Sequence, residues 1–331
     1  ADGARPEALR DATRAALEGA IHDRLARDAA GGFGAFLSGG VDSTTVTGLL
    51  TRDSGGAIAT FSIGFSEERF NELQFARIAA SAFHTRHTEY FVTPRDTEDA
   101  VLAVAEAFDE PFGNASAVPT YYCAKVAREH GVTTMFAGDG GDELFAGNQR
   151  YADSRIFEPY DRIPRWIRDP LLTPAIAAAG KIVPHPLFVK AGKYVRRASL
   201  PPAERIVSYD FWNVVPPSSF VMPDVVAAAA SERWRPAAMT IHHHDRARAR
   251  TALDRHLALD LKVTLSDNDV PKVTRMCDRA GVAVRFPFLD ERVVDVATRI
   301  PARLKMQGGN LRTFFKDAYR DLLPEETRAK T

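Results

Sequence analysis

Short apolar runs alternate with segments of helical periodicity along the first half of the chain, and this alternation is the strongest constraint on its fold. The runs at residues 33–37, 58–65 and 132–137 have the length of buried strands, and residues 87–92 are predicted to form the third strand in chain order. The segments between them repeat apolar side chains three and four positions apart, as the inner face of a helix does. Helices are expected at 71–83, at 96–108 with Val101, Leu102, Val104 and Ala105 inward, and at 313–323, and a loop is expected at 109–120. The sequence therefore predicts an α/β fold: a parallel sheet of about five strands with helices on both faces, the fifth strand being residues 282–286.

Three segments with different character are expected. Residues 1–30 are predicted to form a leading surface helix, because Leu17 and Ile21 fall on one stripe among charged residues. Residues 31–150 carry the alternating pattern and form the α/β core. Residues 151–331 contain clustered prolines and alanine runs, which favour a mostly helical lobe followed by a return to the core.

Composition limits the classes of partner. The 43 basic residues balance the 43 acidic ones, so nothing favours a nucleic-acid partner, and no apolar run approaches the roughly 20 residues that cross a bilayer. Cys123 and Cys277 lack the paired spacing of a zinc site and the density of a disulfide scaffold, so both are expected to be buried thiols. These features predict a cytoplasmic protein with no membrane partner.

The first apolar run leads into Ser-Gly-Gly-Val-Asp-Ser at residues 38–43, and this loop can bind an anion. Gly39 and Gly40 allow a ligand to approach the backbone, while Ser38 and Ser43 add hydroxyl donors. A carboxylate beside a phosphate repels it unless a cation lies between them, so Asp42 implies Mg²⁺. The alternative is a glycine-rich turn with a serine that caps the following helix.

Two signature strings and three further stretches resemble a known family. Residues 38–43 resemble the pyrophosphate loop of the ATP pyrophosphatases, which split ATP between the α and β phosphates. The string Gly-Asp-Gly-Gly-Asp-Glu-Leu-Phe-Ala-Gly at 138–147 resembles the one that marks the synthetase domain of the asparagine synthetase family, glutamine-hydrolysing type. The further matches lie at 110–112 with 116–121, at 284–290 and at 320–326. The fold implied is that of the adenine nucleotide α-hydrolases, also called HUP domains.

The resemblance implies an ATP and metal site between the two signature loops. Asp42 and Asp142, each beyond a parallel strand, would hold one Mg²⁺, although Asp142 could instead cap the following helix. The backbone around Phe36, Ile63 and Gly138 would hold the adenine. The side chains of Phe36 and Ile63 are equally compatible with an ordinary core, whereas a glycine at a strand end lets a base or phosphate approach.

Other residues are candidates for the acyl substrate. Asp139 matches a family position with a role in substrate positioning or proton transfer, and Glu143 is either functional or a first-turn structural carboxylate. Lys272 and Arg275, in the charged, turn-rich stretch 266–278, match a basic cluster of the family. They are candidates to bind the substrate carboxylate or the phosphates, or else they belong to a solvated surface.

Both ends suggest a domain taken from a longer protein. In the family the leading helix follows a glutaminase domain, which opens with a nucleophilic cysteine and supplies ammonia. After the region of Pro324 the family has a lysine, followed closely by Gly-Phe, that contacts the α-phosphate. Lys330 lies near that position without the Gly-Phe context. We therefore expect the chain to be truncated at its C-terminus. We also expect it to bind ATP and Mg²⁺ better than it catalyses the reaction.

The implied reaction is ATP-dependent amide formation. The side-chain carboxylate of aspartate attacks the α-phosphate, pyrophosphate leaves, and ammonia displaces AMP from the acyl-adenylate to give asparagine. A β-lactam synthetase, a peptide cyclase and a sugar-acid amidotransferase would use the same loops on another carboxylate. A nucleotide-binding module without catalysis is a further alternative, and the neutral net charge disfavours a tRNA-modifying pyrophosphatase. The sequence also leaves a homodimer open.

Overall fold

The computed structural model describes residues 5–28, 32–65, 73–110, 112–168, 171, 174, 192, 194–207, 215, 217–228 and 236–330. The chain divides into two compact units. Residues 1–148 and 260–331 form the first, and residues 149–259 form the second.

The first unit is built on a five-stranded, all-parallel sheet in the order β3-β2-β1-β4-β5. Its strands are β1 (Phe33–Phe36), β2 (Ala59–Phe65), β3 (Arg86–Val92), β4 (Thr134–Phe136) and β5 (Ala283–Arg285). The predicted α/β fold is thereby confirmed. From β1 the chain builds outward to β2 and β3 on one side and then continues with β4 and β5 on the other. The carboxyl ends of β1 and β4 therefore flank the point where the strand order reverses, where α/β sheets bind ligands.

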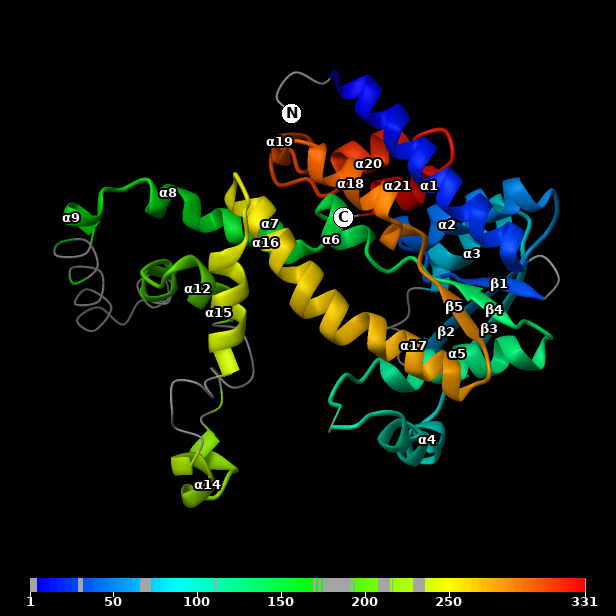
Figure 1. Ribbon diagram of the computed structural model, residues 1–331, viewed down its shortest axis with the longest axis horizontal. Helices are drawn as coiled ribbons and strands as arrows, with labels where there is room; N and C mark the ends of the chain where they lie inside the picture. Colours follow the sequence, from blue (N-terminus) through cyan, green and yellow to red (C-terminus); the bar gives the residue numbers. More distant parts are fainter. Residues whose placement is uncertain are drawn as a thin grey trace. The chain divides into compact units, whose positions relative to one another are not determined.

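Helices cover both faces of this sheet (Figure 1). Ala35 of β1 and Phe136 of β4 pack under α1, α2, α18 and α20, whereas Phe36 and Met135 point to the opposite face, under α5 and α17. This alternation follows from the two-residue period of a strand.

The helical segments of the unit are α1 (Pro6–Asp28), α2 (Val41–Ser54), α3 (Leu73–Ala82), α4 (Pro94–Ala107), α5 (Ala117–Glu129), α6 (Gly141–Phe145), the π-helical η6 (Leu261–Asp269), α17 (Val270–Arg279), the 3-10 turn η7 (Pro287–Leu289), α18 (Glu291–Arg299), α19 (Ala302–Lys305), α20 (Thr313–Ala318) and α21 (Glu325–Ala329).

The inward face expected for α4 is wrong. Val101 and Leu102 were expected to face the core, but their exposed fractions are 57% and 72%. The small side chain of Ala100 packs instead against Val92 and Tyr122. The close packing of α4 on its neighbours therefore depends on an alanine, and the larger side chains are left at the surface.

Other segments also differ from the sequence-based expectations. The loop expected at 109–120 is shorter, because α5 begins at Ala117 with Pro119 in its first turn, where no backbone N–H is needed. The charged stretch 266–278 is helical, with Pro271 again in a first turn. The helix expected at 313–323 ends at Ala318, and a further short helix starts after Pro324. The helix expected at 71–83 begins at Leu73 in the structure, and residues 66–72 lie outside the described part.

The second unit is helical in its described residues, as expected of the lobe. Its segments are α7 (Gln149–Ser154), the 3-10 turn η2 (Arg155–Phe157), α8 (Glu158–Asp161), α9 (Arg165–Ile167), α12 (Pro202–Val207), the 3-10 turn η4 (Pro217–Ser219), α14 (Pro223–Ala228), α15 (Pro236–Arg246) and α16 (Ala252–Asp260), which runs into η6. A small core joins Phe157 and Tyr160 to Val195 and Ala198. Arg205 ties this core together with two hydrogen bonds of 2.9 Å to Asp161.

Cys123 and Cys277 are both buried and free, as the sequence predicts. Within the part of the chain that the structure describes, none of the helices has the length and apolar character needed to cross a membrane.

Candidate nucleotide and metal site

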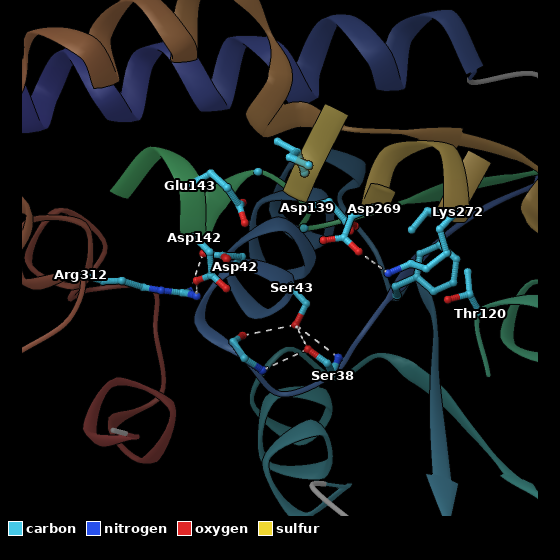
Figure 2. Close-up of a pocket in the computed structure, with 16 residues that line it drawn as sticks. Ser38, Asp42, Ser43, Thr120, Asp139, Asp142, Glu143, Asp269, Lys272 and Arg312 are labelled. Carbon is cyan, nitrogen blue, oxygen red and sulfur yellow. Dashed lines mark hydrogen bonds and ion pairs between the residues drawn. The ribbon is translucent and has the colours of Figure 1, made fainter. Parts of the chain in front are cut away.

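A cavity of about 370 Å³ opens at the carboxyl ends of β1 and β4, where the strand order reverses (Figure 2). This volume lies in the range of small-molecule sites. Of the sequence-predicted residues, Phe36, Ser38, Gly40, Asp42, Ser43, Gly138, Asp139, Asp142, Glu143 and Lys272 line it. Both signature loops therefore face one space, although about 100 residues separate them in the sequence.

The first loop is shaped by its own serines. The backbone N–H of Ser38 donates to Ser43 Oγ at 3.2 Å, the two hydroxyl oxygens lie 3.0 Å apart, and the Gly40 N–H donates to Ser38 Oγ at 3.3 Å. Gly39 has φ 73°, and a Cβ there would overlap the backbone of α3 at Ala76. The residue that caps α2 is Gly40, which makes no side-chain cap, so the alternative of a helix-capping serine does not describe this loop.

The second loop packs directly on the first. A Cβ at Gly138 would lie 2.8 Å from the backbone nitrogen of Ser43, and one at Gly141 would overlap the carboxyl group of Asp42. The loop then turns at Gly140, with φ 99°, into the five-residue helix α6. The contact between the two loops is thus sufficient to explain why a glycine is needed at Gly138.

One arginine joins the two signature loops. Arg312 Nη1 lies 2.7 Å from Asp42 Oδ1, and its Nη2 pairs with Asp142 Oδ1. The side chains of Arg312 and Asp42 are only 12% and 14% exposed. Sequence reasoning missed Arg312. It follows a turn containing Gly308 and Gly309, and nothing in that local pattern relates it to a loop 270 positions earlier.

Asp42 and Asp142 fit a divalent cation. Two carboxylates from separate loops converge on one positive charge, and oxygen ligands of this kind suit Mg²⁺, which usually takes one or two carboxylates together with phosphates and water. Among the described residues, no cluster of three or more His, Cys, Asp or Glu is arranged to hold a metal. A metal held by this pair would need further ligands from water or from a bound ligand.

The cavity accumulates negative charge. Burial raises the pKa of Asp42, against the opposing effect of Arg312. Burial likewise raises the pKa of Asp139 to about 6, which Lys272 partly opposes, and the pKa of Glu143 to about 7. Raised pKa values of this origin mark carboxylates that lack enough positive charge nearby.

A second wall of the cavity comes from α5, η6 and α17. Lys272 is buried, and its Nζ donates to Asp269 at 2.7 Å. Thr120 also lines the cavity. Below this wall Asn114 donates to Asn268 at 3.2 Å, which ties the segment before α5 to η6. An ammonium, a carboxylate and a hydroxyl are thus presented together, as recognition of a polar substrate requires.

Four predicted residues do not line the cavity: Gly39, at the turn of the first loop, and three that lie elsewhere. Arg275 extends along the segment after α4, where it donates to Asp109 at 3.0 Å and its guanidinium lies 5.2 Å from the Phe108 ring centroid. Ile63 packs into the core of the sheet. Lys330 Nζ lies 4.7 Å from the ring centroid of Phe75, at the back of the first loop.

Comparison with known proteins covers nearly the whole chain. The family model for asparagine synthase matches residues 12–331. The chain is 25% identical over 296 residues to asparagine synthetase [glutamine-hydrolyzing] 1 of Bacillus subtilis (strain 168), covering 88% of this chain and 44% of that protein. It is 28% identical over 330 residues to a putative asparagine synthetase [glutamine-hydrolyzing] of Mycobacterium tuberculosis (strain H37Rv), covering 96% and 46%.

A shorter match has higher identity. The putative asparagine synthetase [glutamine-hydrolyzing] 2 of Methanocaldococcus jannaschii is 38% identical over 136 residues, which is 41% of this chain and 26% of that protein. The chain spans about half the length of the curated relatives that it matches over most of its own residues.

Proposed function

Because the chain belongs to the asparagine synthase family, we propose that it carries the adenylate-forming site of an ATP-dependent, amide-forming ligase. The acceptor is the side-chain carboxylate of aspartate. One carboxylate oxygen attacks the α-phosphate, the bond to the β-phosphate breaks, and pyrophosphate leaves. Ammonia then attacks the acyl carbon, loses a proton, and AMP departs to leave asparagine. The observation that carries this proposal is that the carboxylates of Asp42 and Asp142 converge on the guanidinium of Arg312, at the point where the strand order reverses.

The first loop binds the pyrophosphate portion of ATP. Its serine hydroxyls and backbone N–H groups line the cavity, and α2 directs the N–H groups of its first turn toward the same space. Asp42 and Asp142 would hold Mg²⁺, which supplies charge neutralisation at the transferred phosphate. Phe36, at the end of β1, forms an apolar wall for the adenine, with Gly138 beside it.

Lys272, on the wall formed by α5, η6 and α17, and Asp139, on the second signature loop, face the acyl group. The pKa of Asp139, near 6, leaves this carboxylate largely ionised at neutral pH, able to accept the proton that the nitrogen of ammonia loses once it has bonded to the acyl carbon. Lys272 supplies a positive charge for the substrate carboxylate. Lys330 is a proposed α-phosphate ligand that would have to leave Phe75 to reach the cavity. Ammonia would come from a glutaminase domain of the kind implied by the relatives' names, which describe them as glutamine-hydrolysing.

The direct test is an assay for all three products. The protein is incubated with ATP, Mg²⁺, aspartate and ammonium, and AMP, pyrophosphate and asparagine are measured together. We expect the three in equal amounts, and their loss in Asp42→Ala. Asp53→Ala is the matched control, since Asp53 lies on the same helix and pairs with Arg52.

Other outcomes redirect the proposal. AMP and pyrophosphate formed only with another carboxylic acid would keep the chemistry and replace the substrate. Absence of ATP cleavage with every acid tried, despite ATP binding, in the protein extended to its natural ends would contradict the ligase assignment.

A further inference from the structure

Arg312 occupies a position for which the proposed chemistry has so far given no role. Its guanidinium bridges the two carboxylates that would hold the metal, one nitrogen to each (Figure 2). The guanidinium engages one oxygen of each carboxylate and places its own positive charge where a divalent cation would lie. Mg²⁺ and Arg312 therefore compete for the same pair of negative charges.

The backbone of Arg312 is fixed against the loop that carries Asp142. Arg312 has φ 54°, a left-handed conformation that is unfavourable for a residue with a side chain. Its N–H donates to the carbonyl of Ala146 at 3.2 Å, and Ala146, at the end of α6, is itself left-handed with φ 60°. Two strained residues thus hold the base of the arginine beside the metal ligands.

The fold also leaves room for the side chain. A Cβ at Gly147 would overlap both Arg312 and Asp142, so the glycine creates the space in which they meet. Arg312 lines the cavity, and its long side chain can turn from the carboxylates into the cavity without moving the backbone. Two carboxylates and one guanidinium leave this cluster with one negative charge, and a bound divalent cation would reverse its sign.

We propose that Arg312 is an exchangeable counter-ion: it neutralises Asp42 and Asp142 when the site is empty, and is displaced onto the nucleotide phosphates when the metal enters. The inference rests on the proposed function for its nucleotide. A guanidinium binds phosphate oxygens in the same paired geometry that it uses for carboxylates. Arg312 thereby couples the binding of the two ligands. Metal without nucleotide has to displace the guanidinium from the carboxylates, and nucleotide without metal meets a guanidinium that is still paired with them.

The test measures binding rather than turnover. Mn²⁺ replaces Mg²⁺, so that free metal can be counted by electron paramagnetic resonance, and α,β-methylene-ATP replaces ATP. In Arg312→Met we expect Mn²⁺ alone to bind about tenfold more tightly than in the wild type, because its competitor is gone. The same variant should bind the Mn²⁺ complex of the analogue about tenfold more weakly, because a phosphate contact is lost. Arg320→Met, which removes an exposed arginine just beyond α20, should change neither value.

The opposite signs separate this role from a structural one, which would weaken both ligands. Unchanged or weaker Mn²⁺ binding in a folded Arg312→Met protein would overturn the role of Arg312 and leave the ligase proposal standing. If the wild type and the variant bind neither Mn²⁺ nor the analogue, both proposals fail. Should Arg312→Met not fold, Arg312→Lys serves instead. A single ammonium cannot pair with both carboxylates in the same way, so Mn²⁺ affinity must still rise, and no rise overturns the inference.

Discussion

Two groups of carboxylates in the first unit lie in opposite electrostatic surroundings. In the cavity, burial raises the pKa values of Asp42, Asp139 and Glu143. Between α1 and α18, hydrogen bonds from Arg292 and Arg24 hold the pKa of Asp290 well below its usual range, against the effect of burial.

The difference lies in the number of arginine side chains that pair with each carboxylate. The carboxylate of Asp290 accepts hydrogen bonds from the side chain of Arg24 at 2.7 Å and from the side chain of Arg292 at 2.8 Å. It also accepts one from the backbone N–H of Arg292, in the first turn of α18. Asp42 and Asp142 share one guanidinium. A fully paired carboxylate stabilises the fold, whereas an underpaired group leaves a deficit of positive charge that a ligand can fill. Substitutions in the two groups should therefore have opposite consequences.

The largest effect is expected on the chemistry. Asp142→Asn keeps the shape of the side chain and removes a proposed metal ligand, so the rate of AMP formation should fall about 10³-fold, or roughly 4 kcal/mol of transition-state stabilisation. The measurement is AMP release at saturating ATP and aspartate. Asp290→Asn, assayed where it remains folded, should retain the wild-type rate. Comparable losses in both variants would remove the distinction between the two groups.

The next effect is on stability. Asp290→Ala removes a helix cap and two ion pairs at a site that is largely shielded from solvent, and should lower the free energy of unfolding by about 2 kcal/mol at pH 7. Because the folded pKa of Asp290 is lowered, its contribution is complete above the unfolded pKa of about 4 and is lost as the pH falls below it. Urea unfolding at pH 7 and pH 3 measures both quantities.

The unfolding of the first unit needs a probe other than tryptophan fluorescence, and Asp290→Ala needs a control variant. All three tryptophans of the sequence, Trp166, Trp212 and Trp234, fall between residues 149 and 259, outside the residue ranges of the first unit. Hydrogen exchange of the β1 and β4 peptides is therefore the appropriate readout for the first unit. Asp290→Asn retains a good capping residue and separates the cap from the charge. A loss that does not shrink at low pH would show that the ion pairs contribute nothing.

Asp139→Asn should raise the free energy of unfolding, whereas Asp290→Ala should lower it. The pKa of Asp139 is raised to about 6, so between pH 4 and 6 the native protein holds more protons there than the unfolded chain. Stability therefore falls as the pH rises through this interval. Asparagine removes the dependence and should add about 1 to 2 kcal/mol at pH 7 and almost nothing at pH 4. The same unfolding experiment applies, and a destabilised variant at pH 7 would contradict the assignment.

The smallest effect is expected for an exposed pair outside both groups. Asp295 is 57% exposed and pairs with Arg299 one helical turn away at 2.5 Å. Asp295→Asn should change the free energy of unfolding by less than about 0.5 kcal/mol, because water and salt screen such pairs. A larger change would mean that exposure does not predict the strength of ion pairs in this protein.

Much of the sheet and of the first loop could be predicted from local sequence. The five strands fall within two residues of the expected segments. For β1, β2 and β4 the reason is that a short, largely apolar stretch flanked by helical segments favours a buried parallel strand. The phase of α4 could not be predicted. Which face of an apolar helix is buried depends on the neighbour that it meets, and there Ala100 fits where Leu102 does not.

The candidate site divides in the same way. Asp42, Asp139 and Asp142 could be named as candidates because the two strings that carry them resemble those of a known family, and both strings follow parallel strands that end at one edge of the sheet. Arg312 could not be named. Nor could the engagement of Arg275 with Asp109, since both contacts join segments more than 160 positions apart.

The sequence by itself determined the order of strands and helices along the chain, the two aspartate-bearing loops and their common edge of the sheet. Local periodicity and backbone freedom act over a few residues, so a short window contains them. Only the tertiary structure decided which charges meet: the bridge from Arg312 to Asp42 and Asp142, the pairing of Lys272 with Asp269, and the raised pKa of Asp139. Charge pairing and burial depend on distances in space, and those distances exist only once the chain has folded.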